Sequence, residues 1–168
     1  MCITLLACVS FNPVMDYTNN EEFVEDITAC ALHLNSMEED HNRIPVDLVM
    51  AQAIHESEWG RSRFAVEGNN LMGIRTFDPA DDQMKPINIP NSSWGLRIFE
   101  TKCESISYYM DLLNNSHHYK DFREERLMQY SSDLVDLEKL AIELAIYAED
   151  VYYTQKIIQT LKELNDNE

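Results

Sequence analysis

A glutamate near the end of an apolar helical stripe is the residue of this sequence best suited to acid chemistry. Glu56 follows Val49 by seven residues and Gln52 by four, so on a helix it lies within roughly 20–40° of both. Burial of a carboxyl group raises its pKa, and a carboxyl that keeps its proton near neutral pH can act as a general acid. The alternative interpretation is a solvated glutamate at a helix end.

The helix that would carry Glu56 is expected to begin at Pro45, because a proline at the first helical position loses no needed hydrogen bond. Its apolar residues recur at helical spacing and predict a buried stripe: Val46, Val49, Met50, Ala53 and Ile54. Two short strands, 71–77 and 94–99, are expected to follow as a hairpin whose long tip, 78–93, is rich in Asp, Pro and Asn.

Other amphipathic segments predict that the rest of the chain is mostly helical, in an α+β fold. Thr101 and Glu104 have the spacing of a capping box, which predicts a helix that runs from there to Asn115. Apolar periodicity predicts the remaining helices at 20–40, around 119–127, at 134–146 and at 151–164.

Several other chemistries find no support in the sequence. His55 and Glu56 begin like the zinc motif H-E-x-x-H, but Trp59 occupies the closing position, so the ligand count excludes a zinc protease. The four cysteines have no C-x-x-C spacing: Cys2, Cys8, Cys30 and Cys103. A Cys30–Cys103 bridge is an option in an oxidising compartment, but free buried thiols are the favoured interpretation. No metal or cofactor is expected.

Length and charge limit the classes of function. The chain has 168 residues, of which 45% are hydrophobic, and this predicts one folded domain over residues 20–168. A formal net charge of −17 argues against nucleic-acid binding and against attraction to an anionic bilayer. Residues 1–19 contain a short apolar run without preceding basic residues, which is a poor signal peptide but suits a vestigial leader. No stretch approaches the length of a membrane span, and a monomer is expected.

Three segments carry a more specific signal. They read AQAIHESEWGRSRFAVEGNNLMGI (51–74), CESISYYMDLLNNSHHYKDFREER (103–126) and IYAEDVYYTQKIIQTL (146–161). Together they resemble the glucosaminidase family, glycoside hydrolase family 73, whose domain is of the mannosyl-glycoprotein endo-beta-N-acetylglucosaminidase type. The resemblance is greatest to the Bax-like branch of that family and covers about residues 45–164.

This resemblance implies a lysozyme-like fold in which the hairpin forms one wall of a sugar groove. It also implies cleavage of the β-1,4 bond after N-acetylglucosamine in the glycan strands of peptidoglycan. The family's catalytic glutamate maps onto Glu56, and a tyrosine that the family places near the scissile sugar maps onto Tyr147. Such a substrate implies the periplasm or the cell wall as the place of action.

A second catalytic carboxylate is harder to place. Family members often carry an acid on the returning strand of the hairpin, but here that strand has none before Glu100. Asp78 on the tip is the candidate, with Asp81 and Asp82 as alternatives. Without such a group, the acetamido group of the substrate could act as the nucleophile, or Tyr147 could position water.

These gaps leave two alternatives to a glucosaminidase. A lytic transglycosylase or muramidase also works with one catalytic glutamate. A catalytically weak peptidoglycan-binding module would need no second acid.

Five further residues are candidates for substrate binding. Trp59 and Trp94 have rings that could stack on sugars, although packing at the helix end is favoured for Trp59. Asn69 and Asn70 could hydrogen-bond N-acetyl groups or could stabilise a turn. Tyr153 is expected to pack beneath the tyrosine of the Y-A-x-D motif.

Overall fold

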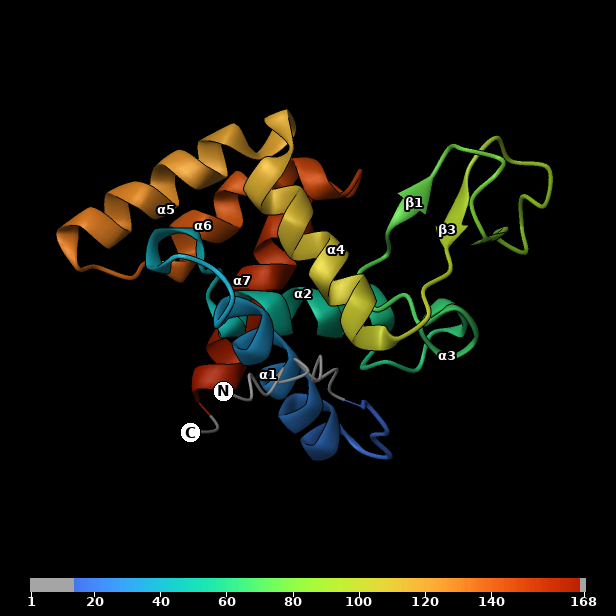
Figure 1. Cartoon of the computed structure of the whole chain (residues 1–168), viewed down its shortest axis with the longest axis horizontal. Helices are drawn as coiled ribbons and strands as arrows, with labels where there is room; N and C mark the ends of the chain where they lie inside the picture. Colours follow the sequence, from blue (N-terminus) through green and yellow to red (C-terminus); the bar gives the residue numbers. More distant parts are fainter. Residues whose placement is uncertain (1–13, 167–168) are drawn as a thin grey trace, which may run out of the picture.

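The computed structural model describes residues 14–166. In chain order its elements are α1 (Asn20–Asn35), η1 (Asp40–Asn42), α2 (Val46–Ser57), α3 (Arg63–Gly68), β1 (Arg75–Thr76), β2 (Gln83–Met84), β3 (Gly95–Arg97), α4 (Lys102–Asn115), η2 (His117–Tyr119), α5 (Lys120–Ser132), α6 (Leu137–Glu143), η3 (Ala145–Tyr147) and α7 (Tyr153–Asn165), where η denotes a 3₁₀ turn. The helices gather on one side, and the small sheet stands apart from them (Figure 1). The prediction of a mostly helical α+β fold is confirmed.

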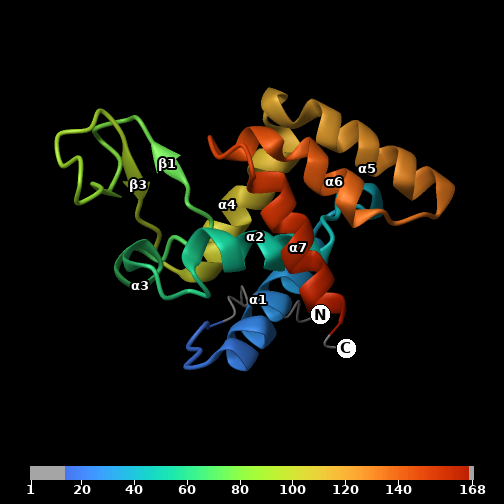
Figure 2. The same ribbon diagram turned by 180° about the vertical axis from the view of Figure 1, so that it is seen from behind.

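Helix α2 lies at the centre of the helical part, and α1 and α7 pack directly against it (Figures 1 and 2). Every residue from 48 to 54 is buried, including the polar Gln52. A helix that is enclosed on all sides needs apolar residues around most of its circumference, which is what this segment supplies. The predicted stripe is therefore buried except for Val46, which is partly buried, and it is only part of the buried surface of α2.

The sheet has shorter strands than the predicted hairpin, and it contains a third strand. β1 and β3 pair antiparallel, with Arg75 opposite Leu96, so the pairing of these two segments is confirmed. The predicted tip contains an unpredicted strand, β2, which pairs with the other edge of β3. Strand structure was predicted from residue 71, but it begins only at Arg75. The reason is that Asn70 makes hydrogen bonds with both the N–H and the C=O of Ile74, so the chain between them curls instead of extending.

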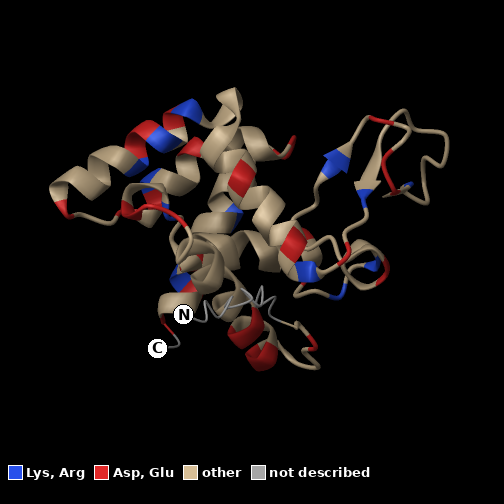
Figure 3. Ribbon diagram, viewed as in Figure 1, with Lys and Arg blue, Asp and Glu red and all other residues tan. Residues whose placement is uncertain are grey.

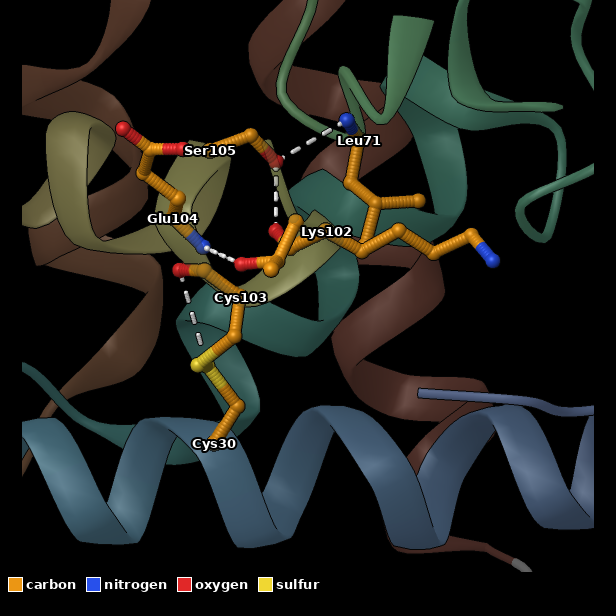
Figure 4. Close-up of a disulfide and its surroundings, with 7 residues drawn as sticks. Cys30, Leu71, Lys102, Cys103, Glu104 and Ser105 are labelled. Atoms are coloured by element: carbon orange, nitrogen blue, oxygen red, sulfur yellow. Dashed lines mark hydrogen bonds between the residues drawn. A yellow bond between two sulfur atoms is a disulfide. The ribbon is translucent and has the colours of Figure 1, made fainter. Parts of the chain in front are cut away.

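The start of α4 is joined to two other parts of the molecule. The side chain of Thr101 accepts a hydrogen bond from the backbone N–H of Glu104, as the predicted cap requires. Ser105 Oγ accepts a hydrogen bond of 3.1 Å from the N–H of Leu71, and Cys103 forms a disulfide with Cys30 of α1 (Figure 4). The expectation of free thiols is wrong for this pair, because α1 and α4 cross with these two Cα atoms 5.8 Å apart.

The C-terminal helices differ from prediction mainly at their ends. The helix predicted at 134–146 begins only at Leu137, because Asp136 caps α6 by accepting a hydrogen bond from the N–H of Lys139. It ends at Glu143 and is followed by the short η3. Before it, α5 extends to Ser132 and ends where Asp133 takes a left-handed conformation. Within residues 14–166, no helix is both long and apolar enough to cross a membrane.

Candidate active site

A cleft of about 450 Å³ lies between the helices and the sheet, and Glu56 lines it. The other walls of the cleft are formed by the segment that leads into β1, by β1 itself, by α4, by η2 and by the segment after α6. The lining residues that matter for chemistry are Glu56, Gly73, Arg75, Tyr119, Tyr147 and Glu149. The cleft therefore joins segments that are as much as 93 residues apart in sequence.

Glu56 has the protonation behaviour of a general acid. Burial at the end of α2 raises the pKa of its carboxyl group to about 7, whereas the Tyr153 hydroxyl bond and the charge of Arg75 lower it. A carboxyl with a pKa near the working pH can be protonated before the reaction and can release that proton during it. The sequence-based prediction of a partly buried acid thus agrees with the geometry.

A series of buried side chains connects Glu56 to two other helices. The Tyr109 hydroxyl of α4 donates a hydrogen bond to Gln52 Oε1, and Gln52 Nε2 donates to the Tyr153 hydroxyl at 2.6 Å. The Tyr153 hydroxyl in turn hydrogen-bonds the Glu56 carboxyl. Tyr153 was expected to bind substrate, but with 1% of its surface exposed it has no face for a sugar. It contacts the acid instead.

Tyr147 lies against this series and also lines the cleft. Its ring stacks on Tyr153, with 6.0 Å between ring centroids, and meets Tyr109 edge-on at 5.6 Å. Its hydroxyl donates a hydrogen bond to the backbone carbonyl of Met72. Burial, and then the charge of Glu56, raise the pKa of Tyr147 well above its usual value, so this hydroxyl stays neutral. The expected stacking of Tyr153 on Tyr147 is confirmed.

The backbone at Gly73 approaches the Glu56 carboxyl closely. Gly73 has a φ of +63°, and a Cβ atom there would lie 2.6 Å from Glu56 Oε2. Any larger residue would be strained in this left-handed conformation and would also press on the acid. Glycine at this position therefore leaves space for the carboxyl group.

The turn after α2 directs the chain away from the cleft. Glu58, Trp59 and Gly60 have φ values of 54°, 60° and 73°, which is a run of three left-handed residues. Trp59 packs edge-on against Phe23, with 5.9 Å between ring centroids, and lines a separate hollow beside α1. Its position agrees with the packing interpretation, and Trp59 is not part of the cleft lining.

The two asparagines hold the backbone rather than face the cleft. Asn69 Nδ2 donates hydrogen bonds to the carbonyls of Phe99 and Glu100, at 3.0 and 3.1 Å. Asn70 is 1% exposed, and its Nδ2 donates to the carbonyl of Arg97 at 2.8 Å in addition to its bonds with Ile74. The prediction that Asn70 binds N-acetyl groups is wrong, because backbone groups already occupy its buried amide.

Arg75 lines the cleft on the sheet side, and Trp94 packs against it. The Arg75 guanidinium lies over the Trp94 ring, 4.3 Å from its centroid, and forms an ion pair of 2.8 Å with Glu149. Trp94 is half-buried behind Arg75 and does not line the cleft itself. The segment after η3 thus contacts the sheet through this ion pair.

The acids of the hairpin tip lie outside the cleft. Asp78 is exposed, and its side chain accepts a hydrogen bond from the N–H of Ala80, as in a tight turn. Asp81 is bonded to Thr76 and forms an ion pair with Arg97. The structure therefore gives Asp78 a turn-forming position and brings neither acid to Glu56.

Sequence reasoning missed Glu149. Among the residues that the structure describes, Glu56 and Glu149 are the two carboxylates that line the cleft. The sequence feature that could have identified Glu149 is its position two residues after Tyr147, within the Y-A-x-D motif. Within residues 14–166, no group of three His, Cys, Asp or Glu side chains is arranged to hold a metal ion.

Comparison with known proteins gives the family. The sequence profile named Glucosaminidase, described as mannosyl-glycoprotein endo-beta-N-acetylglucosaminidase, matches residues 33–166. Protein bax of Escherichia coli (strain K12) is 31% identical over 99 residues, which are 59% of this chain and 34% of that protein. The chain thus spans about a third of the length of this relative.

Two solved structures share the fold. The catalytic domain of the autolysin Auto from Listeria monocytogenes superposes with a TM-score of 0.63 at 19% identity, covering 89% of this chain and 86% of that one. A glycoside hydrolase domain of FlgJ from Salmonella typhimurium gives 0.60 at 17% identity, covering 88% and 99%. The chain belongs to the glucosaminidase family, glycoside hydrolase family 73, and has the lysozyme-like fold of these domains.

Proposed function

We propose that this protein is a peptidoglycan hydrolase that cleaves the β-1,4 bond after N-acetylglucosamine, with Glu56 as the general acid. The observation that carries the proposal is the environment of Glu56. Its carboxyl lines an open cleft, yet burial raises its pKa to about 7. Membership of a family of glycoside hydrolases supplies the class of bond.

In this mechanism Glu56 protonates the glycosidic oxygen as the bond to the sugar C1 breaks. Positive charge then develops on the ring, and a water molecule must add to C1. Glu149 is proposed as the carboxylate that takes a proton from this water, because it lines the same cleft. Arg75 holds Glu149 through their ion pair, and the neutral Tyr147 hydroxyl borders the space that a sugar would occupy.

Substrate capture is expected to depend on contacts rather than on long-range attraction. Both the protein, with its formal net charge of −17, and the peptide carboxylates of peptidoglycan are negative. Acidic residues are concentrated in the first half of α1, and α5 carries charges of both signs (Figure 3). Arg75 is the basic residue that borders the cleft among those described, and it is a suitable contact for a substrate carboxylate.

The proposed place of action is a compartment that contains peptidoglycan and favours disulfides. The Cys30–Cys103 disulfide suits an oxidising environment such as the periplasm or the cell wall.

Digestion of purified peptidoglycan by the wild-type protein and by Glu56→Gln tests the proposal. The soluble fragments are identified by mass spectrometry, and circular dichroism verifies that the variant is folded. We expect reducing N-acetylglucosamine ends from the wild type and a decrease in rate of at least about 10³-fold in the variant, since the amide cannot donate the proton.

Other products would support the other functions. Anhydro-muramoyl ends would indicate a lytic transglycosylase, and reducing N-acetylmuramic acid ends a muramidase. Binding to peptidoglycan without any fragments, equal in both proteins, would indicate a binding module and would refute the proposed hydrolysis.

A further inference from the structure

We propose that the buried series Tyr109–Gln52–Tyr153 positions the Glu56 carboxyl and stabilises its ionised form as its proton leaves. These three side chains act through Glu56 and are therefore positioning residues. The inference rests on the proposed function for its kinetic consequences, but its structural part concerns the titration of Glu56 alone.

The direction of the hydrogen bonds follows from what each group can donate. The Tyr109 hydroxyl gives its single proton to Gln52 Oε1, so the amide of Gln52 must present Nε2 to Tyr153. Because Gln52 Nε2 donates to the Tyr153 oxygen, the proton of that hydroxyl remains available for Glu56. In every hydrogen bond of the series, the donated hydrogen therefore points along the series toward Glu56.

The surroundings make this arrangement rigid. Tyr109 and Gln52 are fully buried, and Tyr153 is 1% exposed, so water does not compete for their hydrogen bonds. The series joins three helices: α4 supplies Tyr109, α7 supplies Tyr153, and α2 supplies both Gln52 and Glu56. Gln52 and Glu56 are one turn apart on the same face of α2. Tyr109 therefore holds this face at Gln52, and Tyr153 holds it at Gln52 and at Glu56.

The series opposes the effect of burial on the acid. Burial raises the pKa of Glu56, while the hydrogen bond from Tyr153 lowers it. A hydroxyl donates more strongly to a carboxylate than to a carboxylic acid, so this bond strengthens as the proton moves to the glycosidic oxygen. Without it, Glu56 would hold its proton more tightly and transfer it less readily.

Other groups also face Glu56 and must remain unchanged when the Tyr153 hydroxyl is removed. They are Arg75 from β1, Tyr109 from α4, Tyr119 from η2, Tyr147 from η3 and Glu149 across the cleft. His55 lies next to Glu56 in sequence, and its ring meets Tyr153 edge-on at 5.5 Å. Removing one hydroxyl from Tyr153 leaves all of these charges in place.

The test is Tyr153→Phe, with the Glu56 carboxyl followed by carbon NMR as pH is varied. The Glu56→Gln variant identifies the signal, because it lacks that carboxyl group. We expect the pKa of Glu56 to rise by about one unit, which is the size of effect for a lost bond to a charged group. Tyr109→Phe should shift it in the same direction by less, since it acts through Gln52. Tyr152→Phe is the matched control, because Tyr152 is 64% exposed and should cause no shift.

The pH–rate profile supplies the kinetic readout. Activity requires protonated Glu56, so the rate falls as pH rises through about 7 in the wild type. In Tyr153→Phe this fall should move about one unit higher, and the maximal kcat should decrease about tenfold. A purely structural role would lower the rate at every pH without moving the profile.

The two proposals fail separately. An unchanged or lowered pKa of Glu56 in both Tyr153→Phe and Tyr109→Phe would overturn this inference even if the wild type is fully active. A wild type without hydrolase activity would refute the proposed function, and a raised pKa in the same variants would still uphold the role of the series.

Discussion

Two carboxylates of the cleft occupy opposite environments. Glu56 is largely enclosed by tyrosines, and burial raises its pKa to about 7. Glu149 is 86% exposed at its side chain and forms an ion pair of 2.8 Å with Arg75. Paired acids in such different surroundings can divide the work of an acid and a base. At the scale of single residues, the cleft therefore contains one enclosed carboxyl group and one exposed, ion-paired carboxyl group.

The role of Glu149 leads to a prediction about rate. Glu149→Gln should lower kcat by roughly 10²–10³-fold, because the amide cannot accept a proton from water. The melting temperature should change little, since an exposed ion pair contributes at most about 1 kcal/mol to stability. The measurement is kcat on purified glycan strands, together with the rescue of Glu149→Ala by added azide or formate.

Asp78→Asn is the control for this prediction, because Asp78 is an exposed acid of the hairpin tip and lies outside the cleft. Its rate should equal that of the wild type. A fully active Glu149→Gln would contradict the role of Glu149 and leave the acetamido group of the substrate or Tyr147 as the alternatives.

At the scale of elements, the segment that leads into β1, residues 71–73, lies against the end of α2. Leu71 is held by Ser105 of α4, Tyr147 is bonded to the carbonyl of Met72, and Gly73 leaves room for the Glu56 carboxyl. These contacts place the backbone of residues 71–73 directly beside the acid. The position of the acid thus depends on a segment without regular structure.

Substitution at Gly73 should therefore damage catalysis. In Gly73→Ala the new methyl group would meet Glu56 Oε2, and alanine is disfavoured at a φ of +63° by roughly 1–2 kcal/mol. We expect kcat/KM to fall at least about 100-fold, as for a displacement of about 1 Å in a catalytic group.

Gly68→Ala provides the comparison for this substitution. Its methyl group would press on the flexible end of Met84, 2.8 Å from Sδ, and would make an ordinary contact of 3.6 Å with Ile98 Cγ1. The residue is outside the cleft. Activity near that of the wild type is expected there. Equal activity in the two alanine variants would show that Gly73 is not needed to place the acid.

The parts of this arrangement that sequence reasoning predicted are local. Helical periodicity placed Glu56 at the buried end of α2, and the spacing of Thr101 and Glu104 marked the start of α4. Such features depend on residues within one or two helical turns of each other.

The parts that it missed depend on contacts between distant segments. The bond from Asn70 to the carbonyl of Arg97 spans 27 residues, and it holds the chain in a conformation that strand propensity does not indicate. The pairing of Glu149 with Arg75 spans 74 residues. The helix predicted at 20–40 includes Cys30, but its periodicity does not identify the helix that crosses it there.

At the scale of the whole molecule, the disulfide joins α1 to α4 across 73 residues (Figure 4). The loop that it closes contains α2, α3 and the sheet, and therefore five of the twelve residues that line the cleft, Glu56 among them. In the unfolded chain this cross-link removes conformational freedom, which corresponds to about 4 kcal/mol for a loop of this length. A chain with a formal net charge of −17 is also destabilised by self-repulsion when it is compact, so this contribution matters.

We therefore expect the double variant Cys30→Ala, Cys103→Ala to lose roughly 2–4 kcal/mol of stability, which lowers Tm by roughly 5–15 °C. Thermal melts of the oxidised wild type, the reduced wild type and the double variant make the measurement. Reductant should lower the Tm of the wild type and leave that of the double variant unchanged. The rate at 25 °C should stay close to that of the wild type, because neither cysteine lines the cleft. If the oxidised wild type and the double variant melted together, the loop closure would add nothing, and packing of α1 against α4 alone would hold the two helices.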